Sequence, residues 1–579
     1  MSTVTSFRWL VVPDETATEP SRDLIGGKAW SLWRMRSLGL RVPPAFVVTT
    51  EACAAYFDDG GLPEGLADEL VTGIRLLEKQ LGRTFGGTER PLLVSVRSGA
   101  AISMPGMMDT ILDLGCNDDV EAALATESGD PDFAAEVHRR FTGFYGRLVL
   151  GCTEDLEDLP DTASVRAAIA GDGEETVPAD PWEQLRAAVA AVFESSRSRR
   201  AVAYRKHYGI PDDLGTAVTV QAMVFGNLDD DSGTGVLFTR NPVDGTREPY
   251  GEYLQRGQGE DVVSGRVTPK PLTDLHERWP TVHTELLEAA ECLDREGKDA
   301  QDIEFTVQGG ELFLLQSRPA KRTARAAVRI AVELVDEGAI DPAEALSRVT
   351  ADQIRTLLRP EIDSGAADLA EVLVSGVAAS PGVATGIVVD TPEAAHANPG
   401  CILVRKSTSP DDVHGMIAAS AVVTEQGGAT SHAAVVSRAL DTPCVVGCGT
   451  GTVESLVGRT VTVDATTGRV YAGELPTSAV DESEDTDLRR LTGWADQLTP
   501  VTVSASESIE PVFDADTLPP EDLGDQLPAI PAGTKTIRGA VFCAPDGVRA
   551  ALDAGVEVIQ TPHRLPVLLA AIAHHRRTS

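Results

Sequence analysis

Residues 427–438 read GGATSHAAVVSR, and this stretch is the most informative part of the chain. It follows the apolar run AVVTE, so a strand should enter a Gly-Gly turn and a helix should leave it. Thr430 or Ser431 can cap that helix, which places His432 in its first turn. Free N–H groups and the helix dipole favour an anion there and disfavour an imidazolium. His432 is therefore suited to take up a phosphoryl group as a neutral nucleophile. On this geometry alone, a surface histidine at a capped helix start is an equal alternative.

The composition of the whole chain limits the class of protein. Its length of 579 residues predicts about three to five domains. Its composition, 42% hydrophobic and 24% charged, predicts that these domains have buried cores. The net charge of −38 disfavours a protein that wraps a nucleic acid, because phosphate backbones need clustered Lys and Arg. A small anion held by a few local cations stays compatible with this charge.

The sequence also bears on cellular location. The first twenty residues lack a basic segment followed by an apolar one, and no apolar run approaches the ~18 residues of a membrane span. Eight cysteines are too few and too scattered for a disulfide framework. We expect a cytoplasmic protein with neither a membrane nor a nucleic acid as partner.

Composition and patterning divide the chain into four segments. Residues 1–340 alternate strand-like and helix-like patches, with glycine-rich joints between them. Residues 341–371 continue a helical pattern and end in a small-residue joint. Residues 372–475 contain short apolar runs and two helical segments, which predicts a compact β/α domain. Residues 476–579 begin as an acidic, proline-bearing linker and end with a pattern for one or two βα units.

A second candidate site lies at residues 95–110, SVRSGAAISMPGMMDT. A buried strand delivers Arg97 to its end, and a loop with Gly99 and Gly106 follows. Small residues let backbone N–H groups approach phosphate oxygens, and arginine adds a planar fork of donors. A plain turn after a strand is the more frequent explanation when this motif is taken alone.

A third candidate site is the predicted hairpin at residues 301–318, QDIEFTVQGGELFLLQSR. A three-residue loop at 308–310, with Gly310 left-handed, pairs Asp302 with Gln316. A two-residue Gly-Gly loop would mix the two faces, so we expect the longer loop. Two carboxylates on one surface suit Mg²⁺ that also touches phosphates, whereas an ordinary half-exposed hairpin is the alternative. The polar face would hold Asp302, Glu304, Thr306, Gln316 and Arg318, and the apolar face Ile303, Phe305, Val307, Phe313 and Leu315.

Taken together, these motifs resemble the pyruvate phosphate dikinase branch of the PEP-utilising enzyme family. Residues 427–438 match the phosphohistidine signature at each defining position, and residues 95–110 are similar to the ATP-domain loop of the phosphate-using branch. The resemblance covers roughly residues 7–475. It implies an α/β multidomain fold with an ATP-grasp domain (1–340), a helical linker (341–371), a swivelling β/β/α phosphohistidine domain (372–475) and a short, degenerate remnant of a (β/α)₈ barrel (476–579).

The resemblance also implies roles for individual residues. His432 and Arg97 would be catalytic, Asp302 and Glu304 would hold Mg²⁺, and Thr430 matches a regulatory phosphorylation site of some members. The implied ATP-binding residues are Lys28, Arg97, Gly106, Met107, Thr110, Gln221, Met223, Gly233, Gly235, Glu260, Gln316 and Arg318. Of these, Gly233 and Gly235 belong to an SGTG segment that resembles a second glycine loop over the phosphates.

The family pattern breaks after Gly473. Only 579 − 473 = 106 residues follow, whereas a complete barrel takes about 200 to 250 residues. Two remaining segments resemble the first barrel strands, but their ends read Ser504-Ala505-Ser506 and Gln560-Thr561-Pro562, without the family's substrate-binding arginines. The pyruvate half-reaction should therefore be missing from this chain. Either a separate barrel protein supplies it, or the final acceptor differs.

The resemblance implies a phosphotransferase of the pyruvate phosphate dikinase type. ATP and phosphate would charge His432 with release of AMP and PPi, and the phosphoryl group would pass to pyruvate, giving PEP, or to another acceptor. Two alternatives stay open: a water-dikinase-like phosphotransferase acting on another small molecule, and a non-catalytic nucleotide-binding phospho-carrier. A homodimer is also left open.

Overall fold

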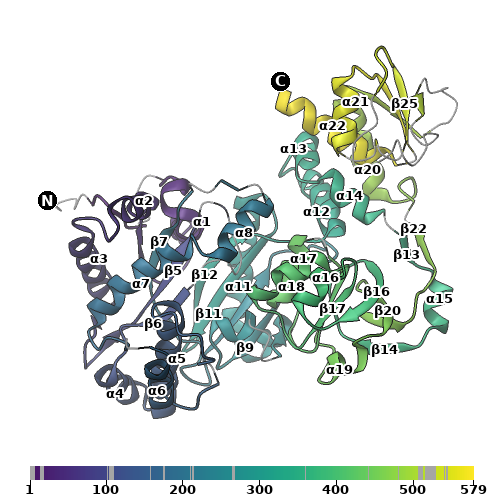
Figure 1. The fold of residues 1–579 in the computed structure, drawn as a ribbon. Coiled ribbons are helices and arrows are strands. Elements are labelled where there is room, and N and C mark those ends of the chain that lie inside the picture. Colours follow the sequence, from purple (N-terminus) through teal and green to yellow (C-terminus); the bar gives the residue numbers. More distant parts are fainter. Residues whose placement is uncertain are drawn as a thin grey trace.

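The computed structural model describes residues 7–13, 19–100, 102, 110–156, 158–173, 176–208, 210–211, 214–263, 268–358, 360–440, 442–479, 481–505, 513–514, 530–539, 542, 545–561 and 563–578. Figure 1 shows an N-terminal domain (residues 7–323) beside a central domain (residues 372–475), with a C-terminal unit (residues 482–578) on a helical segment (residues 324–357).

The first sheet of the N-terminal domain has the strand order β1-β2-β7-β5-β6. β5 and β7 are buried along most of their length: Val94, Val96, Val218 and Val220 form an apolar face that packs with helices in one cluster, whereas the opposite face carries Ser95, Arg97, Thr219 and Gln221. The strands are β1 (Leu10–Val11), β2 (Ala45–Val48), β5 (Val94–Gly99), β6 (Thr110–Leu114) and β7 (Ala217–Ala222). The helices around them are α1 (Arg22–Ser37), α2 (Thr50–Asp59), α3 (Leu66–Leu81) and α7 (Pro181–Ser195).

A further group of helices and two short strands adjoins this sheet. Three of them, α4, α5 and α6, each follow an Asn or Asp whose side chain accepts a hydrogen bond from a backbone N–H of the first turn, which fixes where the helix begins. The elements are β3 (Thr84–Phe85), β4 (Pro91–Leu92), α4 (Asp118–Ser128), α5 (Pro131–Leu148), α6 (Thr162–Asp172) and α8 (Arg199–Tyr208).

The second sheet of the N-terminal domain has the order β10-β9-β8-β11-β12. Ile303, Phe305 and Val307 of β11 pack with helix α11 in one buried cluster, so the opposite face of the sheet is left for polar residues. The strands are β8 (Gly233–Phe238), β9 (Tyr250–Gln255), β10 (Lys270–Pro271), β11 (Gln301–Gln308) and β12 (Glu311–Pro319). The helices are α9 (Gly259–Val263), η1 (Leu272–Asp274), α10 (Leu275–Arg278) and α11 (Pro280–Gly297).

The hairpin β11–β12 differs from the expected one in its loop and register. Gln308 pairs with Glu311, so the loop is the two-residue Gly309-Gly310, with φ of 56° and 78°. A bulge then leaves Leu315 as an extra residue, because Glu304 pairs with Gln316 and Phe305 with Leu314. The expected three-residue loop was wrong because one bulge restores the alternation that the short loop disturbs.

The consequence of this register is a change in the apolar face. Asp302 pairs with Arg318 instead of Gln316, and Asp302, Glu304, Gln316 and Arg318 still share one side. Leu312 and Leu314 supply the core positions. Phe313 and Leu315, expected in the core, are instead the partner of Thr306 and a cavity-lining residue.

The central domain is one eight-stranded sheet of order β14-β21-β20-β16-β17-β18-β19-β15. β17, β18 and β19 are parallel and apolar except for Arg405 and Thr424 at the ends of β17 and β18, since helices cover them. The strands are β14 (Val372–Ser375), β15 (Val377–Ser380), β16 (Val383–Val389), β17 (Ile402–Arg405), β18 (Ala421–Thr424), β19 (Cys444–Val446), β20 (Thr460–Asp464) and β21 (Arg469–Ala472). The helices are α16 (Pro392–Ala397), η2 (Pro410–Asp412), α17 (Val413–Ala418), α18 (His432–Leu440) and α19 (Thr452–Leu456).

The chain enters and leaves the central domain side by side. The incoming strand β13 (Pro360–Ile362) pairs antiparallel with the outgoing β22 (Thr477–Ala479), and α15 (Ser364–Leu369) follows β13. These two strands form a ribbon between the central domain and the rest of the chain (Figure 1).

The C-terminal unit is an open parallel sheet of order β23-β26-β25-β24, not a closed barrel, in the part of the chain described. Its core is continuous with that of the helical segment, and the same cluster reaches Val236 and Phe238 of the N-terminal domain. The helical segment holds α12 (Ala324–Asp336), α13 (Pro342–Ser347) and α14 (Ala351–Leu357). The unit holds α20 (Thr486–Leu498), β23 (Thr502–Ser504), β24 (Phe513–Asp514), β25 (Thr536–Arg538), α21 (Pro545–Asp553), β26 (Val558–Gln560) and α22 (Arg564–Thr578).

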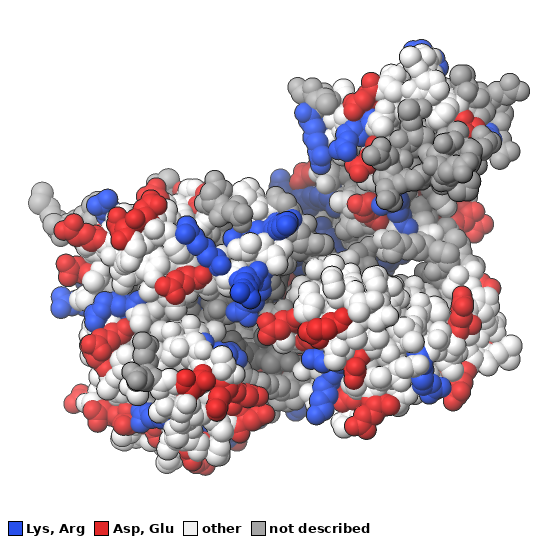
Figure 2. Space-filling model, in the orientation of Figure 1, with Lys and Arg blue, Asp and Glu red and all other residues white. Residues whose placement is uncertain are grey.

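Two surface properties complete the description. None of the helices that the structure describes is long and apolar enough to cross a membrane. On the face drawn in Figure 2, basic side chains stand in small groups among acidic ones and do not form one continuous band.

Candidate active site

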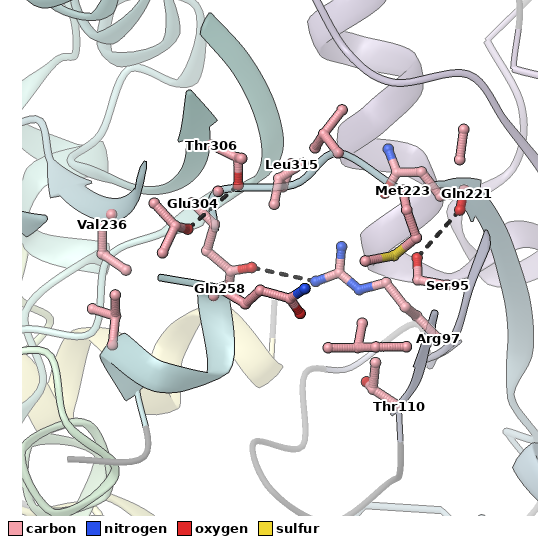
Figure 3. A pocket seen from close by; sticks show the side chains of 18 residues that line it. Ser95, Arg97, Thr110, Gln221, Met223, Val236, Gln258, Glu304, Thr306 and Leu315 are labelled. Carbon is pink, nitrogen blue, oxygen red and sulfur yellow. Dashed lines mark hydrogen bonds and ion pairs between the residues drawn. The ribbon is translucent and has the colours of Figure 1, made fainter. Parts of the chain in front are cut away.

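A cavity of about 210 Å³ lies between the two sheets of the N-terminal domain. Figure 3 shows side chains from both sheets pointing into it. β5, β6 and β7 line one side, and β8, β11 and β12, with α9, line the other. The mixed lining of apolar side chains and a few buried polar groups is typical of a small-molecule site.

Arg97 crosses the cavity from the first sheet to the second. Its Nη2 donates to Glu304 Oε2 and to Gln316 Oε1, each at 3.3 Å. Figure 3 shows the guanidinium extended toward Glu304 across the open space. The sequence-predicted residues Arg97, Glu304 and Gln316 are therefore together, and a guanidinium already stands where an anion would enter.

The two predicted metal carboxylates lie one row apart on β11. Arg318 Nε donates to Asp302 Oδ2 at 2.8 Å, whereas Asp302 Oδ1 is buried without a hydrogen-bond partner among the described residues. Burial raises the pKa of Asp302, against the pull of Arg318. Burial also works to raise the pKa of Glu304, but Arg97, Arg318 and Lys28 outweigh it and hold that pKa below its usual value. Glu304 therefore stays ionised in the site.

Lys28 reaches this site because of a kink in α1. Gly26 has φ 76° and ψ 162° inside the helix, and the Gly27 N–H donates to the Ala100 carbonyl at 2.9 Å. A Cβ on Gly26 would meet the Gly99 carbonyl oxygen at 2.0 Å, so only glycine permits this contact. This contact fixes where the helix resumes after Gly26. Lys28 then lies close enough to Glu304 to help lower the pKa of that carboxylate.

The polar face of the second sheet is ordered in cross-strand rows. Residues directly opposite on antiparallel strands share a face, and three rows follow one another from the strand ends toward the cavity. The first row holds Tyr250, Phe238, Asp302 and Arg318. The second holds Glu252, Val236, Glu304 and Gln316, and the third holds Leu254, Thr234, Thr306 and Phe313. The cavity covers members of the second and third rows, so the Asp302 row lies beyond its end.

The remaining predicted nucleotide residues are spread around the cavity. Thr110, Gln221 and Met223 line it, and Gln221 Nε2 also donates to the Pro43 carbonyl at 3.1 Å. Glu260 lies on α9, next to the lining residue Gly259. Gly106 and Met107 fall outside the described residues.

Gly233 and Gly235 do not form a loop. Both belong to strand β8. A Cβ on Gly233 would meet the Trp279 ring at 2.9 Å, and one on Gly235 would meet the Phe305 ring at 2.5 Å. The absence of side chains here makes room for core aromatics, so the expected glycine loop was wrong, although Gly235 does line the cavity.

His432 opens helix α18 and is largely enclosed. Its Nδ1 lies 3.0 Å from Thr408 Oγ1, and its Nε2 has no hydrogen-bond partner among the described residues. Burial lowers the pKa of His432 to about 4, with Asp412 acting in the opposite direction. The imidazole is therefore neutral near pH 7, and Nε2 is its uncommitted nitrogen.

The residues before His432 bind the N-terminal domain and do not cap the helix. Thr430 Oγ1 donates to Glu252 Oε2 at 2.9 Å, while Ser431 Oγ is buried without a partner among the described residues. A Cβ on Gly428 would meet Glu252 Oε2 at 2.6 Å. Burial raises the pKa of Glu252, and hydrogen bonds from Thr430 and from the backbone of Ala429 oppose that rise.

Sequence reasoning missed Glu252 as a member of this site. It lies 178 positions from Thr430, in a strand whose alternation YGEYLQ is that of an ordinary half-buried strand. Its one sequence signal is an acidic residue among aromatic ones. Docking of the central domain on β9 is what gives it a function.

The residues present fit a divalent cation. The unpartnered Asp302 Oδ1 and the ionised Glu304 carboxylate are the hard oxygen donors that Mg²⁺ prefers. Within the described ranges, no group of three or more His, Cys, Asp or Glu side chains converges. Mg²⁺ usually takes one or two carboxylates and completes its coordination with water and substrate phosphates, so this pair is sufficient.

Comparison with known proteins gives two domain matches. The model of the pyruvate phosphate dikinase AMP/ATP-binding domain matches residues 22–72 and 63–283. The model of the PEP-utilising enzyme mobile domain matches residues 397–468. The first therefore covers most of the N-terminal domain but ends before β11 and β12, whose Glu304, Thr306 and Leu315 also line the cavity. The second covers the part of the central domain that holds His432.

Full-length relatives agree with these matches. Pyruvate, phosphate dikinase of Rhizobium meliloti is 42% identical over 83% of this chain and 59% of its own length. The Clostridium symbiosum protein of that name is 41% identical over 88% of this chain and 63% of its own. The chloroplastic pyruvate, phosphate dikinase 1 of Zea mays is 41% identical over 94% and 60%. The chain thus spans about three fifths of the length of the relatives it matches, and it belongs to the pyruvate, phosphate dikinase family.

Proposed function

We propose that this chain uses ATP and inorganic phosphate to place a phosphoryl group on His432. The supporting observation is the docking of α18 on the face of the second sheet that leads out of the cavity, through Thr430 on Glu252. A histidine nucleophile and a cavity at two ends of one polar surface suit transfer from a bound nucleotide to the imidazole.

The proposed chemistry proceeds in two displacements. Neutral His432 Nε2 attacks the β-phosphorus of ATP, the bond to the α-phosphate oxygen breaks, and AMP leaves with that electron pair. The histidine then carries a pyrophosphoryl group. Inorganic phosphate attacks its terminal phosphorus, PPi leaves, and one phosphoryl group stays on His432. A neutral imidazole is required because a protonated ring has no lone pair on Nε2.

The N-terminal domain would bind and orient the reacting groups. Arg97 spans the cavity, and Arg318 stands beside Asp302. Together with Lys28 they place positive charge along the path of the triphosphate and stabilise the charge that develops in transfer. The proposed nucleotide contacts of the cavity are Thr110, Gln221, Met223, Gly235, Glu260 and Gln316.

Asp302 and Glu304 would hold Mg²⁺. Bound there, the ion would neutralise phosphate oxygens and align the polyphosphate. The chain's own contribution is to keep Glu304 ionised next to the cavity through Arg97 and Arg318, and to hold the desolvated Asp302 carboxyl beside Arg318.

A second transfer would pass the phosphoryl group on. We propose pyruvate as acceptor, after the names of the relatives, with the central domain turning on the β13–β22 ribbon. A separate barrel protein in the cytoplasm is the proposed partner for this step, because the ends of β23 and β26 carry Ser504 and Gln560, and Arg538 at the end of the neighbouring β25 is hydrogen-bonded to Gln560.

Labelled ATP tests the charging step. Protein-bound label from β-³²P-ATP should persist after phosphate is added, and label from γ-³²P-ATP should leave as PPi. His432→Ala should abolish both, while His414→Ala, an exposed histidine of the same domain, should label normally. Equal labelling of the His432→Ala variant, or phosphate-independent release of the γ-phosphoryl group, would contradict the proposal.

A further inference from the structure

Arg438 is a buried cation that the proposed mechanism leaves without a role. It lies on α18, six residues after His432, and is 4% exposed. Its Nη1 donates to the Ala379 carbonyl within the central domain at 2.8 Å. Its Nε and Nη2 have no hydrogen-bond partner among the described residues. Buried guanidinium N–H groups normally have acceptors, so this arrangement indicates a ligand.

The unpaired side of Arg438 faces the N-terminal domain. Its guanidinium carbon lies 5.7 Å from the centroid of the Phe238 ring, and Phe238 is the direct cross-strand partner of Asp302. Burial lowers the pKa of Arg438, and Asp302 opposes that shift most strongly, ahead of Cys444, Tyr250 and Glu252. Arg438 therefore stands over the first row of the polar face.

Two unmet groups consequently face each other across the domain boundary. Arg438 presents two N–H donors, and Asp302 presents the buried, unpartnered oxygen Oδ1. They are not hydrogen-bonded to each other. A group that joins them must offer oxygen acceptors to the guanidinium and a cation to the carboxylate. A phosphate that carries a divalent cation has both properties.

The order of the rows gives the direction from which that phosphate comes. The cavity covers the third and second rows, and Asp302 with Arg438 follows at the first. A polyphosphate that runs out of the cavity along the carboxylates reaches Arg438 at its far end. Resting on the proposed function, we propose that Arg438 binds the terminal phosphate of this polyphosphate, and binds PPi after transfer.

This inference gives the central domain a second part in the reaction. His432 would supply the nucleophile, and the same helix would supply a cation that reaches the site only when the domain docks. Because Arg438 reaches the site only when the domain docks, phosphate binding should favour the docked state. Without the phosphate, docking buries two guanidinium donors that have no acceptor.

Equilibrium binding tests this inference apart from turnover. Affinities for Mg–PPi and for AMP are measured by calorimetry on the full chain and on Arg438→Gln, Arg438→Lys and Arg459→Gln. Arg459 is an exposed guanidinium of the same domain and serves as the matched control. We expect Arg438→Gln to weaken Mg–PPi about tenfold or more, Arg438→Lys to weaken it less, and AMP affinity to stay unchanged in all variants.

Two outcomes would overturn the inference. Wild-type Mg–PPi affinity in folded Arg438→Lys and Arg438→Gln would mean that Arg438 is only structural, and so would an equal loss of AMP and Mg–PPi. If Arg438→Gln does not fold, Arg438→Lys decides alone, since a weaker PPi affinity is still expected from a lost planar fork. If His432 is not labelled in the wild-type chain, the proposed function is wrong, but the affinities for Mg–PPi and AMP are unaffected. Failure of the proposed function and failure of this inference are therefore distinguishable.

Discussion

Removing the carboxylate of Glu252 tests how the central domain is held against the N-terminal domain. Glu252 Oε2 accepts the Thr430 hydroxyl at 2.9 Å, and the backbone N–H groups of Ala429 and Thr430 are directed at the same carboxylate. Glu252→Ala leaves these donors buried without an acceptor. Each unsatisfied group costs about 1–3 kcal/mol, and the removal of a buried charge offsets part of this cost. The free energy that favours the docked over the undocked state should therefore fall by about 3 kcal/mol. This is a fall of about 150-fold in the docking equilibrium.

Single-turnover labelling of His432 at saturating ATP and phosphate measures this loss. The labelling rate of Glu252→Ala should fall by about two orders of magnitude, and Glu252→Gln should fall less, because an amide oxygen still accepts. AMP affinity should not change, since Glu252 does not line the cavity. Glu248→Gln is the control, because Glu248 is exposed just before β9.

Either of two results would refute the reasoning. If Glu252→Ala labels at the wild-type rate, the contact with Thr430 contributes nothing to charging. If AMP affinity falls together with the labelling rate, Glu252 supports the fold of the N-terminal domain and does not act through docking.

Three further predictions concern single residues. Gly26→Ala should lower Tm by several degrees and weaken ATP binding, because its Cβ would meet the Gly99 carbonyl. The control Gly39→Ala, at φ 75° with nothing within 4 Å of the new Cβ, should cost only the left-handed strain of about 1 kcal/mol in stability. Equal losses of stability in both variants would contradict the clash. His432 should titrate near pH 4 by NMR in the docked chain. Because burial lowers this pKa, the state that buries the ring should lose stability as the pH falls from about 6.5 toward 4, and a titration near 6.5 would show that the ring is solvated. Arg97→Met should weaken ATP at least tenfold, since it removes the cation that spans the cavity, and equilibrium dialysis with unchanged ATP affinity would argue against that role.

The sequence was sufficient for the local part of the site. The strand, turn and helix around His432 follow from short-range patterning, and α18 begins at that residue. The alternation of β11 placed Asp302 and Glu304 on one face, as found. The caps expected from Thr430 or Ser431 were wrong, because a distant carboxylate takes the Thr430 hydroxyl.

The hairpin register shows where local patterning ends. Both a three-residue loop and a two-residue loop with a bulge keep the carboxylates on one side, and they differ only in which leucines face α11. Packing against α11 selects Leu312 and Leu314, and no pattern within 301–318 encodes that helix. The same holds for Gly233 and Gly235, whose missing side chains fit rings of Trp279 and Phe305.

The sequence by itself determined which residues are proposed to carry the chemistry: a histidine at a helix start, an arginine at a strand end and two carboxylates at alternate positions. The tertiary structure alone decided how they meet. Glu252 and Thr430 are 178 positions apart, and Arg438 faces Asp302 across a domain boundary. Strand and helix periods act over a few residues, whereas docking depends on two complete surfaces, so the contacts that join nucleotide cavity and histidine exist only once both domains have folded.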